Sequence, residues 1–173
     1  AMLDFLESKN LYLYLMLFSI AYPLAQSFEH RITYYKKWKR LIPSILIMML
    51  IFIPWDIWFT HIGVWWFNDK YITGIKIFNL PIEEWAFFII VPFSCIFIYE
   101  VLNYFIKKDI IASIANILIV IKLIILTLLL IFIENGLYTQ ITFTLALLLL
   151  AFLLIKKPNW VGRFLMMYYI SWI

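Results

Sequence analysis

Residues 54–100 read PWDIWFTHIGVWWFNDKYITGIKIFNLPIEEWAFFIIVPFSCIFIYE, and this stretch joins two long apolar runs through an aromatic loop. It places three carboxylic acids, Asp56, Glu83 and Glu84, beside apolar and aromatic side chains. A charge at membrane depth is costly, so an ionisable residue inside an apolar run indicates a functional site. Acids next to apolar surface suggest proton chemistry on an apolar substrate.

The composition of the chain indicates an integral membrane protein. Of its 173 residues, 66% are hydrophobic, 20% are aromatic and 14% are charged, and a soluble domain of this size could not bury so much apolar surface in one core. The net charge of +4 does not predict a nucleic-acid partner, because the basic residues cluster in short segments between apolar runs, as membrane topology requires. Membrane lipid is the partner that the composition predicts.

The apolar runs predict an all-α fold, a multi-pass bundle of about six helices, since one crossing needs about 20 apolar residues. The predicted helices cover residues 11–26, 42–59, 81–106, 110–133 and 139–155, and a sixth begins near residue 159 and is incomplete at residue 173. Residues 1–173 are expected to form a single membrane domain.

The distribution of Lys and Arg between the helices predicts the orientation in the cell membrane. Three basic residues lie in the connections on one side, namely Lys9, Lys70 and Lys76. Ten lie in the connections on the other side, namely Arg31, Lys36, Lys37, Lys39, Arg40, Lys107, Lys108, Lys156, Lys157 and Arg163. Because positive charge accumulates on the cytoplasmic side, the N-terminus is predicted to be non-cytoplasmic.

The loop after the second predicted helix is unusually aromatic for a solvated connection. Between residues 60 and 81 it contains Trp65, Trp66, Phe67, Tyr71 and Phe78. Gly63 and Gly74 permit tight turns there. We expect the loop to be re-entrant and to fold back onto the bundle. The alternative is an interfacial aromatic belt, since Trp and Tyr favour the headgroup level in any membrane protein.

The third predicted helix opens with Pro81, followed by Glu83 and Glu84. Proline at the first helical position with acids in the first turn is typical of a helix start. With Leu80 as the N-cap, Glu83 is placed to reach the free backbone N–H groups. Glu84 lies about 100° further round the helix and is not explained by capping. At least one of the two acids is therefore a candidate functional residue.

Asp56 follows Pro54 near the end of the second predicted helix, and the up-and-down helix order returns it to the same membrane face as Glu83 and Glu84. Neighbouring carboxyl groups cannot all ionise in a low dielectric, so one of them should keep a proton near neutrality and could act as a general acid without a cofactor. In the structural alternative, Asp56 bonds Thr60 or the loop backbone.

The pattern PWD..FT..GVWWFN...Y.TGI.I.NLPIEEW.FF...PF.C.FIYE resembles the membrane lycopene cyclases of the heterodimeric and fused, non-flavin type, most closely the N-terminal half of the fused bacterial form. A cyclase-like repeat would cover about residues 42–106, and LPIEE is its most specific element. By resemblance, Pro81, Glu83 and Glu84 match a Pro-x-Glu-Glu motif whose acids are needed for cyclisation. The positions that match the family's upstream pattern are Asp56, Gly63, Trp65, Phe67, Asn68 and Gly74.

The resemblance implies that the substrate is lycopene or a related carotenoid, whose linear ends become β-ionone rings without net redox change. Ring closure requires protonation of the terminal alkene, attack of the internal alkene on the tertiary cation, and loss of a proton from the ring carbon. Glu83 or Glu84 would donate the proton, and the other or Asp56 would accept one. The residues expected to bind substrate and to offer π faces to the cation are Trp55, Trp58, Trp65, Trp66, Phe67, Asn68, Phe87 and Phe88.

No cofactor is expected, because the sequence has no Gly-rich phosphate loop and no His or Cys spacing typical of a metal site. Glu100 and Lys122 are expected to neutralise each other if their helix faces meet. Two other functions stay open: a cyclase for C50 carotenoids or another isoprenoid, and a non-enzymatic transport or binding subunit. Fused family members have two tandem halves, whereas the pattern does not recur after residue 110 here, so a second cyclase half or subunit is a further partner to consider.

Overall fold

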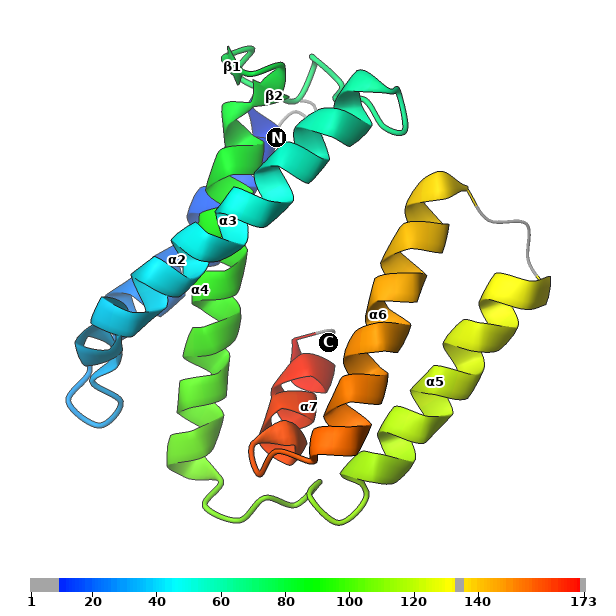
Figure 1. Cartoon of the computed structure of the whole chain (residues 1–173). Coiled ribbons are helices and arrows are strands. Elements are labelled where there is room, and N and C mark those ends of the chain that lie inside the picture. The colour runs from blue at the N-terminus through cyan, green and yellow to red at the C-terminus, as the bar shows by residue number, and fades with distance from the viewer. Residues whose placement is uncertain (1–9, 133–135, 172–173) are drawn as a thin grey trace, which may run out of the picture. The chain divides into compact units, whose positions relative to one another are not determined.

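The computed structural model describes residues 10–132 and 136–171, and these form an all-α protein (Figure 1). The chain divides into two compact units, Ala1–Tyr104 and Phe105–Ile173. Six α-helices lie within the described residues, and four of them are long and apolar enough to cross a membrane. The predicted helical membrane bundle is thereby confirmed. Residue 133 and the residues after 171, where two of the predicted helices end, lie outside the described part of the chain.

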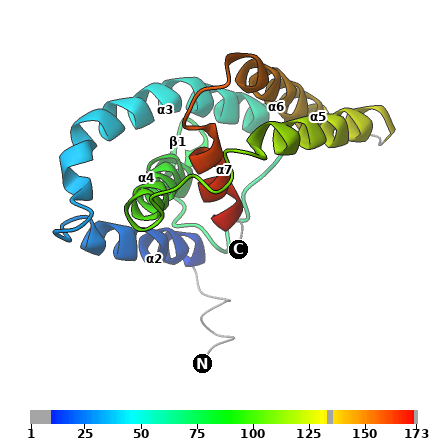
Figure 2. The same ribbon diagram turned by 90° about the horizontal axis from the view of Figure 1, so that it is seen from below.

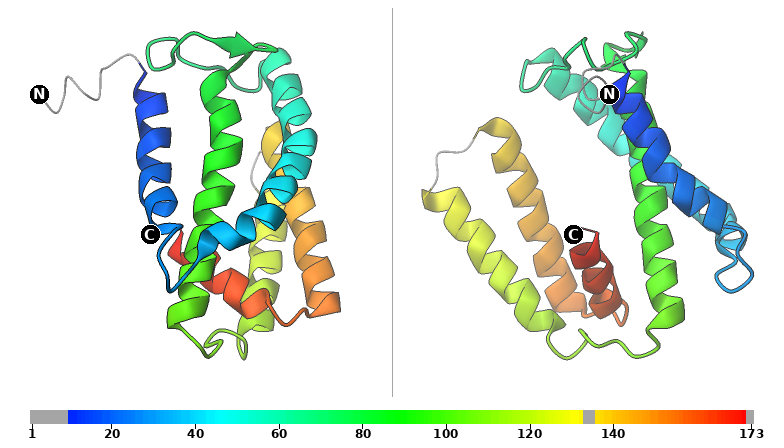
Figure 3. Two further views of the ribbon diagram at one scale, coloured as in Figure 1. Left: turned by 90° about the vertical axis from the view of Figure 1, so that its left-hand side faces the viewer. Right: turned by 180° about the vertical axis from the view of Figure 1, so that it is seen from behind.

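The first unit contains three long helices and a small hairpin. Its elements are α2 (Leu11–Gln26), the 3-10 helix η1 (Tyr34–Lys37), α3 (Trp38–His61), β1 (Lys76–Ile77), β2 (Leu80–Pro81) and α4 (Ile82–Phe105). Helix α4 lies between α2 and α3 (Figures 2 and 3). Helix α2 has the predicted bounds. Helix α3 begins at Trp38, earlier than expected, because the basic segment before the apolar run is itself helical.

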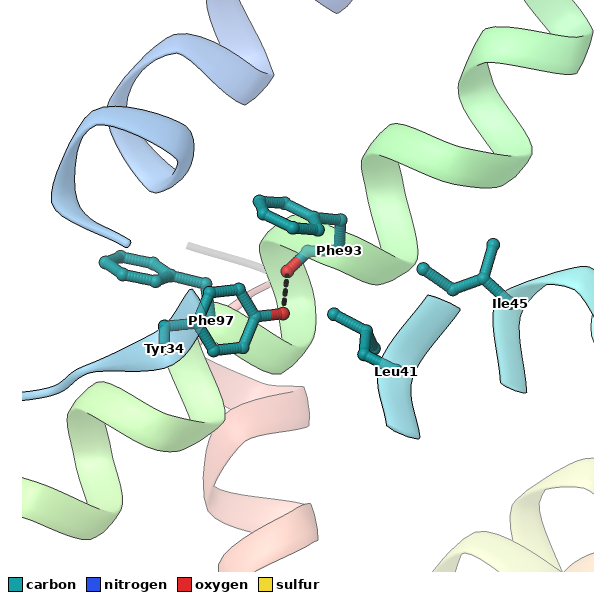
Figure 4. Packing of buried hydrophobic residues seen from close by; sticks show 5 residues of the cluster. All are labelled: Tyr34, Leu41, Ile45, Phe93 and Phe97. Carbon is teal, nitrogen blue, oxygen red and sulfur yellow. Dashed lines mark hydrogen bonds between the residues drawn. The ribbon is translucent and has the colours of Figure 1, made fainter. Parts of the chain in front are cut away.

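The packing of α3 and η1 against α4 is centred on Tyr34 (Figure 4). This side chain is fully buried, and its hydroxyl donates to the carbonyl oxygen of Phe93 at 2.8 Å. Its ring lies edge-on to Phe93 and Phe97, with centroids 5.1 and 5.5 Å away. Leu41 and Ile45 of α3 complete the cluster. Because the buried hydroxyl has a partner, the aromatic ring can be buried without leaving an unpaired polar group.

Helix α2 packs along α4 through weaker contacts. The rings of Tyr22 and Phe97 meet edge to face with their centroids 6.2 Å apart. The hydroxyl of Ser94 donates to the carbonyl oxygen of Ser19 at 3.2 Å. The two helices therefore run in the same direction, and the first residues of α2 lie near the first residues of α4.

The hairpin that precedes α4 changes how that helix begins. Strands β1 and β2 are antiparallel, with Ile77 opposite Leu80. The two residues between them, Phe78 and Asn79, have φ angles of 52° and 63°, as a tight two-residue hairpin turn requires. Pro81 is thus the last residue of β2 and not the first of the helix, which begins at Ile82. Proline fits this strand end because the position does not need its N–H group.

The aromatic loop folds back onto the helix ends, as predicted. Gly63 and Gly74 have φ angles of 75° and 89°, a region that glycine enters without strain. Ile72 is only 2% exposed. The backbone N–H of Tyr12 in α2 donates to the carbonyl oxygen of Tyr71 in the loop at 3.2 Å. The loop is therefore attached to the start of α2 as well as to the hairpin.

The second unit consists of α5 (Ala115–Phe132), α6 (Leu137–Lys156) and α7 (Val161–Ile170). Helices α5 and α6 are antiparallel neighbours (Figure 1). Its buried cluster is formed by Ala115, Ile119, Leu153, Val161 and Leu165. Helix α5 begins at residue 115 and not at 110, because turns occupy the residues before it.

Glu100 and Lys122, which the sequence suggested as a neutralising pair, each have a partner within their own unit. Glu100 forms an ion pair with Lys37. The Nζ of Lys122 lies 3.7 Å from the ring centroid of Tyr168 and 4.8 Å from that of Tyr169, an arrangement that stabilises the cation through the aromatic faces. Lys37 precedes α3, and the periodicity of the apolar runs could not show that it meets the last turns of α4.

Candidate functional site

The last turns of α3, the hairpin and the first turn of α4 lie at the same end of the first unit (Figure 1). Asp56 in α3 is 6% exposed and Glu83 in α4 is fully buried. Glu84 interacts electrostatically with both of these carboxyl groups. The structure therefore brings the three acids together at one end of the helices, which we refer to as the acid cluster (Asp56, Glu83 and Glu84).

Glu84 has a partner from a distant part of the chain. The hydroxyl of Tyr12, at the start of α2, donates to Oε1 of Glu84 at 2.7 Å. Tyr12 also interacts electrostatically with Asp56 and Glu83, so it belongs to the same cluster. Sequence reasoning missed this residue. A tyrosine near the end of an apolar helix is typical of membrane interfaces, and only the packing of α2 on α4 distinguishes Tyr12 from the other tyrosines.

Glu83 does not cap its own helix as expected. The backbone N–H of Thr73, in the loop, donates to its Oε1 at 2.7 Å. Its Oε2 is buried and has no hydrogen-bond partner among the described residues. The hairpin holds the loop beside the first turn of α4. A loop amide therefore donates to Glu83, where an amide of the helix itself was expected to donate. Glu83 thus fixes the aromatic loop, and one of its oxygens is left unpaired, which is uncommon for a buried polar atom.

Asp56 is surrounded by the last turn of α3 and the loop. The Thr60 hydroxyl donates to the main-chain carbonyl oxygen of Asp56 at 2.8 Å, so the expected bond between these two residues involves the backbone and not the carboxyl group. The indole N–H of Trp65 donates to the Thr60 hydroxyl at 3.0 Å and also interacts with the Asp56 carboxyl group. Trp65 therefore connects the loop to the acid cluster.

Aromatic rings form a group beside Asp56. At its centre is Phe59, which is fully buried and was not among the predicted site residues. Its ring centroid lies 5.4 Å from that of Trp55, 5.0 Å from that of Trp58 and 5.2 Å from that of Trp65. Three of the predicted tryptophans thus share one partner. Phe59 was indistinguishable in the sequence from any other apolar residue of the run.

The other predicted binding residues have different environments. Trp66 is 84% exposed. The side-chain oxygen of Asn68 accepts a hydrogen bond from the Lys70 N–H at 3.0 Å, as in a turn that an asparagine side chain stabilises. Phe67 is partly buried. Phe87 and Phe88 are edge to face in α4, with centroids 5.7 Å apart.

A metal site needs several His, Cys, Asp or Glu side chains grouped around one point. No three His, Cys, Asp or Glu side chains within residues 10–132 and 136–171 are grouped so that they could hold a metal ion. The acid cluster itself does not form such a group, although it contains three carboxyl groups.

The fold and this site define a helical membrane protein with a cluster of buried acids and aromatic rings at one end. A family model described as lycopene cyclase matches residues 9–102 and 135–173. This match covers most of the chain and includes every residue of the acid cluster and its aromatic surroundings. The chain belongs to the lycopene cyclase family.

Comparison with curated proteins gives a distant relative. The chain is similar to a bifunctional lycopene cyclase/phytoene synthase of Aspergillus oryzae (strain ATCC 42149 / RIB 40), with 26% identity over 66 residues. The matched region is 38% of this chain and 11% of that relative. The chain therefore matches only a small part of the longer protein. No solved structure matches the chain significantly.

Proposed function

We propose that this protein cyclises the linear ends of lycopene to β-ionone rings by proton transfer at the acid cluster. The observation that carries the proposal is the grouping of three acids and Tyr12 at one end of an apolar helical unit. Membership of the lycopene cyclase family and the name of the Aspergillus oryzae relative support the substrate class. Cyclisation is an isomerisation, so the only reagent it needs is a proton.

Glu84 is the residue that we assign to the first proton transfer. It is less buried than Glu83, and the Tyr12 hydroxyl fixes the position of its carboxyl group. In this mechanism Glu84 donates a proton to the terminal alkene, and the resulting tertiary cation is attacked by the internal alkene. A positioned general acid contributes roughly 10²- to 10⁴-fold to such a step.

Asp56 is the residue that we assign to the second proton transfer. It is buried and belongs to the same acid cluster as Glu84. After ring closure, removal of a proton from the ring carbon forms the ring alkene and neutralises the cation. The proton added and the proton removed balance, so the product is an isomer of the substrate. No oxidant or reductant enters the reaction.

The aromatic group around Phe59 supplies the surroundings that a carbocation needs. The faces of Trp55, Trp58 and Trp65 can stabilise positive charge. Exclusion of water by these rings prevents the cation from being captured as an alcohol. Glu83 has a positioning role in this proposal, because its bond to the Thr73 amide holds the loop that carries Trp65.

The experiment that tests the proposal is expression of the complete gene in a bacterial host that accumulates lycopene, followed by chromatographic analysis of the pigments. We expect conversion to γ-carotene or β-carotene, and loss of both when Glu84 is replaced by Gln. Pigments with another type of ring would indicate that the proton is removed from a different carbon of the cyclised cation. Unchanged lycopene from a well-expressed, complete gene would contradict the proposal.

A further inference from the structure

A groove lies between α3 and α4 at the end opposite to the acid cluster. It has a volume of about 510 Å³, within the range of about 300–1,000 Å³ typical of ligand sites. Its apolar wall is formed by Leu41, Ile45, Met48, Pro92 and Ile96. The apolar wall follows α3 for two turns, so the groove is elongated along the helix axis, as an extended hydrocarbon chain would require.

The mouth of the groove carries charge that is only partly neutralised. Lys37, Arg40 and Glu100 line the groove where α3 begins and α4 nears its end. Lys37 forms an ion pair with Glu100. Arg40 is exposed, and its guanidinium group forms no hydrogen bond or ion pair with any of the described residues. The mouth of the groove thus carries one positive charge in excess, that of Arg40, beside the apolar wall.

We propose that this groove binds an anionic phospholipid, with the phosphate at Arg40 and one acyl chain along the apolar wall. An arginine presents donors that match phosphate oxygens in pairs, and basic pockets between membrane helices are typical sites for anionic headgroups. The neighbouring Lys36 and Lys39 are exposed and strengthen the local positive field. A hydrocarbon carotenoid has no charge to match Arg40, so charge complementarity favours the phospholipid. The inference does not depend on the proposed cyclase activity.

The test is a lipid titration of the purified full chain by native mass spectrometry, with phosphatidylglycerol and phosphatidylcholine as the probes. Wild-type protein should bind phosphatidylglycerol more tightly. Arg40→Gln should lower that affinity about fivefold, which corresponds to about one cation near an anionic headgroup, and should lower phosphatidylcholine binding less, because the choline cation offsets the charge of its phosphate. Arg31→Gln is the matched control for net charge, since it removes the same charge from an exposed residue that is paired with Glu29 and does not line the groove.

Two further variants distinguish lipid binding in the groove from nonspecific attraction of the lipid to the exposed basic residues. Glu100→Gln frees Lys37 from its ion pair and should raise the affinity for phosphatidylglycerol by about the same factor. Met48→Trp should fill the groove and weaken binding of both lipids. The proposal is overturned by equal wild-type affinity for the two lipids, by equal losses in Arg40→Gln and Arg31→Gln, or by displacement of phosphatidylglycerol by lycopene. Circular dichroism of each variant confirms that the helices are retained.

Discussion

The hydrogen bond from Tyr12 to Glu84 gives the most direct test of the acid cluster. Tyr12→Phe removes one hydroxyl group and keeps the aromatic ring, so the packing of α2 is preserved. The oxygen of Glu84 that accepted the bond at 2.7 Å then loses its donor. We expect the variant to fold and to cyclise lycopene more slowly, because the carboxyl group is no longer held in position.

The size of the effect follows from the kind of bond that is lost. A hydrogen bond to a charged group is worth about 1.5–3 kcal/mol. If the whole of this is lost from the transition state, the rate falls roughly 10- to 150-fold, since about 1.4 kcal/mol corresponds to a factor of ten. The substrate KM should change little, because in this mechanism the hydroxyl acts through the acid that it holds.

The assay is the rate of ring formation in membranes that contain the complete cyclase and are supplied with lycopene, measured together with the thermal stability of the purified protein. Tyr22→Phe is the matched control, because it removes a hydroxyl from the same helix at a residue that is 67% exposed. A wild-type rate for Tyr12→Phe would refute the positioning role. Equal losses of rate in Tyr12→Phe and Tyr22→Phe would show that the rate depends on the surface of α2 in general and not on the bond to Glu84.

The remaining predictions concern the acids, the loop and the reagents. Glu84→Gln should abolish ring formation but fold normally, because the amide oxygen can still accept from Tyr12; measurable cyclisation at the normal rate would exclude Glu84 as the proton donor. Glu83→Gln should lower the melting temperature, because the new amide N–H₂ group can occupy the place of a buried oxygen that has no partner. An unpaired buried donor costs about 1–3 kcal/mol, and an unchanged melting temperature would contradict this. Gly74→Ala should destabilise the loop by about 1–2 kcal/mol, because the φ angle of Gly74 is 89°. Gly136→Ala, at a φ angle of −65°, should not destabilise the protein, and similar melting temperatures for the two variants would contradict the strain argument. The complete enzyme should cyclise lycopene without added flavin, nicotinamide cofactor or divalent metal and after chelation; an obligate need for reduced flavin would overturn the mechanism.

The apolar runs of the sequence were sufficient to predict the helices. Each run must satisfy its backbone groups internally in a membrane, and a helix is the simplest way to do so. For that reason the predicted bounds of the first helix, residues 11–26, agree with α2. Errors occurred at ends where polar residues join a helix, as in the basic turn before residue 42, or where turns replace it, as before residue 115.

The tertiary structure decided the partners of the acids. The sequence indicated Asp56, Glu83 and Glu84 because carboxyl groups are rare in apolar surroundings. It could not show that Glu83 accepts from the Thr73 amide, because this bond depends on how the hairpin turns. Local rules predict a helix cap at that position, and the hairpin supplies a competing donor.

Long-range contacts were the least predictable feature. Tyr12 and Glu84 are separated by 72 positions in the chain, and Lys37 and Glu100 by 63. Helix periodicity fixes which residues share a face of one helix, but it does not fix which faces of two helices meet or at what height. The sequence alone therefore determined the membrane environment, the helices and the candidate acids, whereas only the packing of α2 and α3 on α4 decided which side chains complete the site and where charge is left unpaired.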